Sequence, residues 1–285
     1  LCDMAEVHAA FAAQIANGAA AVERERVEIA ELRVVQSVDM QFIGQTHLLR
    51  VPLPDAVPTR EALQALIELL AHPKLAASLR HGAYETAGIL PLGAAYLFIN
   101  DRTINSVEKM AGHTMAVFDN DRAQSLMAER IGVRPELSDI SNFSSKFNNG
   151  VVDVIAAPAV AYRPLELYRG VGVKGMVVKM ATVQLTLQLV LRHERFSDEF
   201  MARSRRYFAD QFEQAMEVVR AAEDELLFFY PPPDKDQERY VEMMNDARLF
   251  LIDAGVYDTA MMTWMKKVRC KVDPVRAECG NGSPW

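Results

Sequence analysis

The sequence lacks an excess of positive charge and lacks a hydrophobic run long enough to span a membrane. Its 285 residues include 31 Lys and Arg against 38 Asp and Glu, a net charge of −7. This net negative charge does not indicate a nucleic-acid-binding protein. The longest apolar stretch, residues 177–191, is interrupted by Lys179, Gln184 and Gln188 and falls short of the ~20 residues of a transmembrane helix. No basic and apolar leader opens the chain, so we expect Leu1 to be an internal start.

Motifs of catalysis and cofactor binding are also lacking. The sequence holds no HExxH, no P-loop and no GxGxxG. The histidines at 72, 81, 113 and 193 are scattered and share no motif with a Ser or Cys nucleophile. We therefore predict no catalytic residues, no metal ligands and no cofactor, and expect that the protein is not an enzyme.

Cysteine is scarce, with only Cys2, Cys270 and Cys279. Eight residues separate the last two, a loop that a disulfide can close in an oxidising compartment. From the spacing alone, a disulfide and two free thiols near the end of the chain are equally good interpretations. No histidine or third cysteine lies near enough in sequence to favour a metal site.

Half of the residues are hydrophobic and the length suffices for two lobes. A helix is expected from Thr59, an N-cap candidate, to Pro73, because apolar residues recur at helical spacing between them. Further expected elements are a strand over 94–99 after a turn at 91–93, strands over 173–179 and 183–192, and helices over 197–222, 237–254 and 259–268. In the front part we expect a helix over 4–30, strands over 32–38 and 47–52, and a proline-rich linker over 51–59.

Residues 113–165 are the most informative stretch. A short apolar run, TMAVF (114–118), is followed by a helical segment that Gly132 ends and by a second apolar run, 151–157, that Pro158 stops. Two loop-forming clusters, 138–145 and 148–150, lie between them. This order predicts a βαβ unit with parallel strands, and such sheets bind ligands beyond the carboxyl ends of their strands.

That edge supplies the candidate ligand-binding residues, which are Phe118, Asp119, Asn120, Phe143, Lys146, Pro158 and Tyr162. Structural interpretations compete with this role. A helix N-cap is the favoured interpretation for Asp121 and is as good as a ligand contact for Asp119. For Tyr162, a packed core position fits as well as a cleft wall.

Several blocks carry a family resemblance, among them YETAGILPLGAAYLFINDRTINSVEK (84–109), FDNDRAQ (118–124), ISNFSSKFNNGVVDVIAAPAVAYRPLELYRG (140–170) and KVRCKVDP…EC (267–279). Over about residues 66–279 the chain resembles the AdeT-like solute-binding proteins of Gram-negative bacteria, which are associated with RND-type efflux and similar to TRAP transporter receptors. The resemblance implies an α/β, type II periplasmic-binding-protein fold of two lobes with C-terminal helices. It also implies a Cys270–Cys279 disulfide and a periplasmic location.

TRAP receptors typically carry an arginine, in the strand corresponding to 114–118, that clamps a substrate carboxylate. Here Met115, Ala116 and Val117 fill that place. The resemblance therefore favours a neutral or apolar ligand over an organic acid.

Residues 1–60 resemble something else. AFAAQIANGAAAVE and DMQFIGQTHLLRVP (39–52) are similar to an internal piece of the hydantoinase/5-oxoprolinase A subunit, from which no catalytic residue carries over. We therefore expect a hydantoinase-like segment over 1–58, an incomplete first lobe over 59–111 and 195–285, and a second lobe over 112–194.

The expected function is capture of a small molecule between two lobes for a membrane transporter or an RND-type pump component, without nucleic acid. The alternatives are a fragment of a hydantoinase/oxoprolinase-type amidohydrolase and a non-functional fusion.

Overall fold

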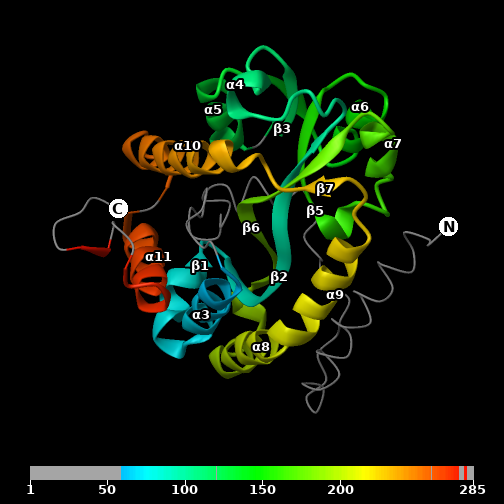
Figure 1. The fold of residues 1–285 in the computed structure, drawn as a ribbon. Coiled ribbons are helices and arrows are strands. Elements are labelled where there is room, and N and C mark those ends of the chain that lie inside the picture. The colour runs from blue at the N-terminus through cyan, green and yellow to red at the C-terminus, as the bar shows by residue number, and fades with distance from the viewer. Residues whose placement is uncertain (1–58, 120, 258, 276–278, 281–285) are drawn as a thin grey trace.

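The computed structural model describes residues 59–119, 121–257, 259–275 and 279–280 (Figure 1). The helix and strands expected over 4–52, and the linker up to residue 58, lie outside these residues. The elements are α3 (Arg60–Ala71), η2 (Pro73–Leu79), β1 (Arg80–His81), β2 (Tyr84–Ile99), α4 (Val107–Met110), β3 (Thr114–Phe118), α5 (Arg122–Arg130), β4 (Arg134–Ser138), α6 (Phe143–Asn148), β5 (Val154–Pro158), η3 (Ala159–Ala161), α7 (Leu167–Val171), β6 (Met176–Arg192), η4 (His193–Arg195), α8 (Asp198–Asp210), α9 (Phe212–Asp224), β7 (Phe229–Tyr230), α10 (Asp234–Asp253) and α11 (Thr259–Val272).

The described strands form one mixed sheet in the order β4-β3-β5-β2-β6-β7, and β1 pairs with β2. β3 lies between β4 and β5 and is parallel to both. The predicted βαβ unit is therefore confirmed. β4 was not expected, because Pro135 and the polar residues around it give no apolar run, and it occupies the edge of the sheet.

Two long antiparallel strands, β2 and β6, run through the whole molecule (Figure 1). The prediction of a turn at 91–93 is wrong, because those residues lie inside β2. The two strands expected over 173–192 are a single strand. In both places the pairing register shifts, between Pro91 and Gly93 and again between Ala95 and Leu97. The sequence patterns that predicted strand ends at these two places coincide with β-bulges instead.

The helices divide into two groups around the ends of these strands. We call half I the part with α3, α8 and α11, whose core is built from residues such as Leu63, Leu66 and Met265. We call half II the part with β3–β5 and α4–α7, whose two cores lie on opposite faces of the sheet and include Phe98 and Ile99, respectively. Figure 1 shows half I below and half II above, with α9 and α10 running between them.

The helix expected over 197–222 is two helices, α8 and α9, which meet at Gln211. The break lets each helix follow β2 separately. Phe208 of α8 lies over Gly88, and Val219 of α9 lies over Gly93, at positions where a Cβ atom would collide with them. The loop expected over 138–145 contains the start of α6 instead, while Thr59 caps α3 as expected, accepting from the Ala62 N–H at 3.2 Å.

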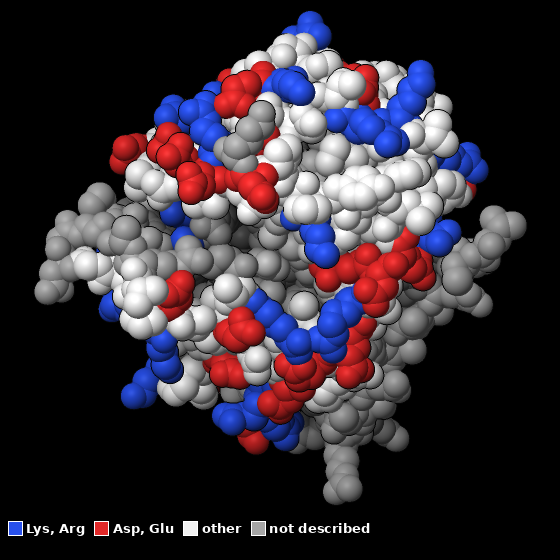
Figure 2. Space-filling view, viewed as in Figure 1, with Lys and Arg blue, Asp and Glu red and all other residues white. Residues whose placement is uncertain are grey.

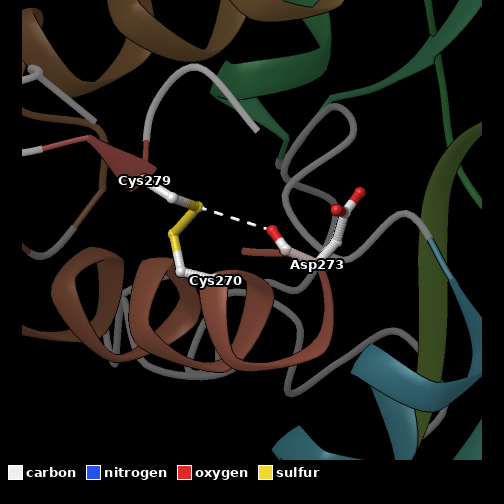
Figure 3. The surroundings of a disulfide bond; sticks show 3 residues. All are labelled: Cys270, Asp273 and Cys279. Carbon is white, nitrogen blue, oxygen red and sulfur yellow. Dashed lines mark hydrogen bonds between the residues drawn. A yellow bond between two sulfur atoms is a disulfide. The ribbon is translucent and has the colours of Figure 1, made fainter. Parts of the chain in front are cut away.

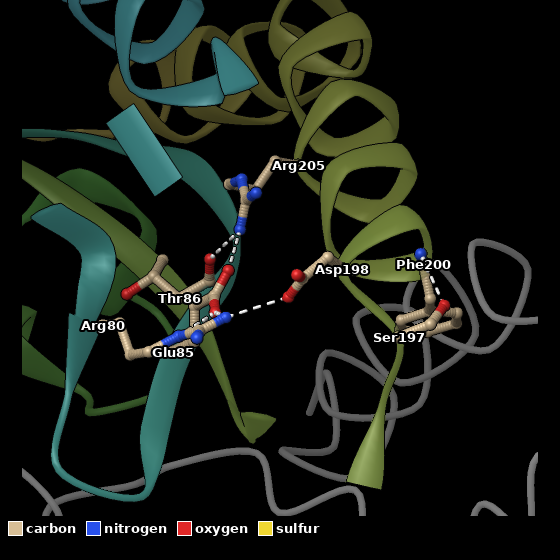
Figure 4. Close-up of polar contacts among 7 residues, drawn as sticks. All are labelled: Arg80, Glu85, Thr86, Ser197, Asp198, Phe200 and Arg205. Carbon is tan, nitrogen blue, oxygen red and sulfur yellow. Dashed lines mark hydrogen bonds and ion pairs between the residues drawn. The ribbon is translucent and has the colours of Figure 1, made fainter. Parts of the chain in front are cut away.

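A buried ion pair fixes α8 to β2 in half I (Figure 4). The side chains of Glu85 and Arg205 are 1% and 3% exposed and contact each other, and Arg205 also donates to the carbonyl of Thr86 at 3.3 Å. Arg80 donates to Glu85 at 2.8 Å and to Asp198 at 2.9 Å. The network gives the buried Glu85 carboxylate two arginine partners, as buried charges in proteins require.

The surface charge is uneven. Figure 2 shows acidic side chains gathered over α9 and over α10. Exposed acids there are Glu213, Glu217, Asp224, Glu225, Asp234, Glu238 and Glu242. This face repels phosphate groups of nucleic acid or anionic lipid. Within the described residues, no helix is both long and apolar enough to cross a bilayer.

Candidate functional site

The carboxyl ends of β3, β4 and β5 meet at one edge of the sheet. β3 and β5 pair through Met115–Val154 and Ala116–Ile155, and Phe118 pairs with Ser138 of β4. The Asp119 N–H continues this ladder by donating to the Ser138 carbonyl at 2.9 Å. Phe118, Asp119 and Pro158 therefore lie along the edge where parallel strands place ligands.

This edge faces half I. Ala123, in the first turn of α5 directly beyond β3, is 4% exposed and packs into the half I core, and Leu126 packs against the same core. Arg130 at the end of α5 lies over the Phe250 ring of α10, 5.0 Å from its centroid. The carboxyl end of β3 thus lies at the junction of the two halves, where a two-lobed protein would hold a ligand.

The three aromatic candidates lie in one apolar cluster of half II. Phe118 and Phe143 have ring centroids 5.1 Å apart, and Phe143 is 6% exposed. Tyr162 is 1% exposed and stacks on Phe98 at 6.0 Å, and its burial raises the pKa of its hydroxyl. Tyr162 therefore occupies the packed position that the sequence allowed as its alternative, whereas Phe118 remains half-buried at the edge.

The polar candidates differ in how strongly they are held. Asp121 caps α5, accepting from the Gln124 N–H at 3.1 Å, as expected. Asp119 is exposed. The Lys146 ammonium donates to Glu136 at 2.9 Å and to the Leu137 carbonyl at 2.6 Å, which uses two of its three donors. Asn120 lies outside the described residues.

Pro158 ends β5 and pairs with Ala95 of β2, next to the register shift between Ala95 and Leu97. The ligand-binding roles of all seven candidates remain predictions. The structure brings Phe118, Asp119, Phe143 and Pro158 to one edge and places Tyr162 behind it.

Asp139, which was not predicted as a site residue, follows β4 at the same edge. Its carboxylate accepts from the Ser141 side chain and N–H and from Asn142, and these hydrogen bonds hold the pKa of Asp139 below its ordinary value. The pattern Asp-x-Ser-Asn is typical of such a side-chain turn. It was overlooked because β4 itself was not expected.

Cys270 and Cys279 form a disulfide at the end of α11, with Cα atoms 5.5 Å apart (Figure 3). The pairing implied by the family resemblance is confirmed. The Cys279 sulfur lies 3.7 Å from the carbonyl oxygen of Asp273, one residue past the helix. The bond ties the chain after α11 back onto the helix.

The described residues bring no three His, Cys, Asp or Glu side chains together as a metal site would require. His113 contacts Asp153 at 3.2 Å, at the amino ends of β3 and β5 and so at the opposite edge from the candidate site. His72 accepts from the Lys74 N–H at 3.2 Å.

The fold matches solved structures of one class. A TRAP periplasmic solute-binding protein from Ralstonia eutropha with bound (S)-2-acetolactate aligns with a TM-score of 0.64, at 14% identity, over 77% of this chain and 73% of that one. One from Desulfovibrio salexigens with bound orotic acid aligns with a TM-score of 0.62, at 14% identity, over 82% and 78%. The protein thus has the two-lobed α/β fold of periplasmic solute-binding proteins.

The family follows from sequence. The family model described as "Solute-binding protein AdeT 1/2" matches residues 28–282, and the chain belongs to this family of solute-binding proteins. Probable solute-binding protein AdeT1 of Acinetobacter baumannii is 37% identical over 214 residues, 74% of this chain and 70% of the relative. AdeT2 of the same organism is 23% identical over 225 residues, 78% and 94% of the two chains.

The family match begins before the expected seam. It starts at residue 28, so it includes residues 39–52 of the hydantoinase-like segment but not residues 10–23. The match thus begins earlier than residue 66, where the resemblance to the solute-binding family was expected to start, and the hydantoinase resemblance is not supported.

Proposed function

We propose that this protein captures a small molecule between half I and half II in the periplasm and delivers it to a membrane transport partner. The observation that carries the proposal is the position of the carboxyl ends of β3–β5, which meet half I at the Ala123 contact. Family membership supports binding rather than catalysis. The Cys270–Cys279 disulfide suits an oxidising compartment.

The proposed mechanism is closure of the two halves on the ligand. A ligand shifts this equilibrium only through contacts that are better in the closed arrangement. Phe118, Asp119 and Pro158 are the proposed contacts from half II. β3 contributes no cation, since Met115, Ala116 and Val117 are apolar and at most 3% exposed, so we propose a neutral or apolar ligand. The membrane partner would be a transporter or an RND-type pump component.

A thermal-shift screen tests this function. The panel contains neutral metabolites, apolar drugs, organic acids and amines, each at up to millimolar concentration. A ligand at 100 times its dissociation constant should raise the melting temperature by about 5 °C. Small-angle scattering should then show a smaller radius of gyration. A panel with no shift and no compaction would contradict the proposal.

Two variants connect that ligand to the proposed site. Phe118→Ala should reduce the ligand-induced shift, because it removes a half-buried ring at the edge. Val218→Ala is the matched control, because Val218 is 54% exposed on α9. Equal shifts in Phe118→Ala and the control would place the ligand elsewhere.

A further inference from the structure

Helix α9 contacts the cores of both halves. Phe212, in its first turn, is 2% exposed within the half I core, and Ala222, near its end, packs against the half II core. Figure 1 shows α9 running beside β2 from α8 in half I to β7 in half II. Any rotation of one half against the other must therefore bend α9 or detach one of its ends.

Between those contacts, α9 crosses β2 at an irregular point of the strand. Gly93 has a φ of 88°, in the left-handed region, and lies where the β2–β6 register shifts. A Cβ atom at Gly93 would lie 2.6 Å from Val219 of α9. Glycine is needed both for the backbone and for the close approach of the helix, so the strand is least regular where the helix is closest.

Polar contacts fasten the two ends of α9. On the half I side, Glu213 contacts Arg60 of α3. On the half II side, the Tyr96 hydroxyl donates to Glu223 at 2.6 Å and Arg163 donates to Glu225 at 2.9 Å. Side chains of the Arg163 pair are 59% and 52% exposed, so water screens that contact.

The Tyr96–Glu223 hydrogen bond is better protected than the ion pairs. Both residues are half-buried, and the Tyr96 ring meets Phe229 of β7 edge to face with centroids 4.9 Å apart. Burial, together with the neighbouring Glu223 carboxylate, raises the pKa of Tyr96, so the hydroxyl keeps its proton and donates at any physiological pH. Hydrogen bonds to a charged partner are among the stronger ones in proteins.

We propose that the Tyr96–Glu223 hydrogen bond is a latch that holds α9 on the half II side of the Gly93 bulge and so restricts movement between the halves. Rotation about the bulge would require the last turn of α9 to leave β2. Breaking the latch would release that turn while Phe212 and the Glu213–Arg60 contact keep the other end in place.

Spin-label distance measurements on the full chain test this latch without any ligand. Labels go on cysteines introduced for Glu68 of α3 and Glu129 of α5, both exposed, with Cys2→Ser in the background. Tyr96→Phe keeps the ring but removes the hydroxyl. It should add a second distance component whose population is about tenfold above that in the parent protein, the factor expected of a hydrogen bond to a charged group. Glu223→Ala should add the same component. Because it leaves the Tyr96 ring intact, agreement between the two variants would exclude a change in ring packing as the cause.

Two controls decide the interpretation. Glu223→Gln keeps an acceptor oxygen for the hydroxyl but loses its charge, so it should add less of the second component than Tyr96→Phe does. Tyr168→Phe removes a hydroxyl that donates to Glu166 at 3.3 Å within half II and should change nothing. The latch is refuted if Tyr96→Phe leaves the distribution unchanged, or if either control broadens it as much. Because no ligand is used, failure here leaves the proposed function untouched.

Discussion

At the scale of single residues, the Glu85–Arg205 pair is the most deeply buried ionic contact between β2 and α8 among the described residues. Removing one partner leaves a buried charge that Arg80 compensates only from one side. Arg205→Leu should therefore lower the free energy of unfolding by about 3 kcal/mol, measured by urea denaturation. Arg203→Leu, which removes a 51% exposed arginine of the same helix, should cost less than ~0.5 kcal/mol. Equal losses would show that the pair adds no more than a surface contact.

Asp153 should make the stability of the folded protein depend on pH. Its burial opposes ionisation, but hydrogen bonds from Thr114, His113 and Asn100 outweigh this and hold the pKa of Asp153 below its ordinary value. A depressed folded-state pKa contributes stability that is present above the unfolded-state pKa and lost as pH falls through the folded-state value.

The Asp153→Asn variant should therefore be less stable than the parent at pH 7, and the difference should shrink as pH falls from about 5 to below 4. Urea unfolding across that range measures it. Asp224→Asn, at an exposed position on α9, should follow the parent curve. A gap between Asp153→Asn and the parent that stays constant with pH would contradict the assignment.

Single residues were predictable from the sequence where the chemistry is local. Thr59 and Asp121 were expected as helix caps because capping needs only a side-chain oxygen and the next turn. Tyr96 and Glu223 were not found, because their contact joins positions 127 apart in the chain. For the same reason the sequence left the position of Tyr162 open.

At the scale of elements, the disulfide beyond α11 closes a loop with a sequence separation of 9. Constraining so short a loop in the unfolded chain is worth about 2–3 kcal/mol. Reduction with dithiothreitol should lower the melting temperature of the parent by several degrees, as followed by circular dichroism.

The double variant Cys270→Ser/Cys279→Ser should already melt at that lower temperature and should not respond to the reductant. An unchanged melting temperature of the parent on verified reduction would show that the α11 packing through Met262, Met265 and Val268 fixes this end without the bond.

Periodicity predicted the existence of most elements but misplaced their ends. The patterns at 91–93 and 180–182 resembled strand breaks, yet β2 and β6 continue through them because each strand pairs with the other on both sides of the bulge. Residues 197–222 have one helical periodicity but form two helices, because both must pack on β2. Local patterns do not contain these pairing constraints.

At the scale of the whole molecule, the two halves are connected through shared elements rather than a simple linker. β2 and β6 pair from Tyr84–Arg192 to Ile99–Met176. β6 supplies Met176 and Val177 to the half II cores. β2 supplies residues to the cores of both halves, with Ile89 in half I and Phe98 in half II. α10 does the same, with Tyr240 in half II and Leu251 in half I. Because these elements are shared, we expect that neither half can unfold without disrupting the other.

The molecule should therefore unfold in a single cooperative transition. Loss of half I would expose β2 around Ile89, and the same strand continues to residues 95–99, which pair with β5 in half II. Differential scanning calorimetry should give one peak in which the calorimetric and van't Hoff enthalpies agree. Two peaks, or a calorimetric enthalpy well above the van't Hoff value, would mean that the halves fold independently. The closure mechanism would then require a flexible linker between them, because the paired strands could not be the pivot.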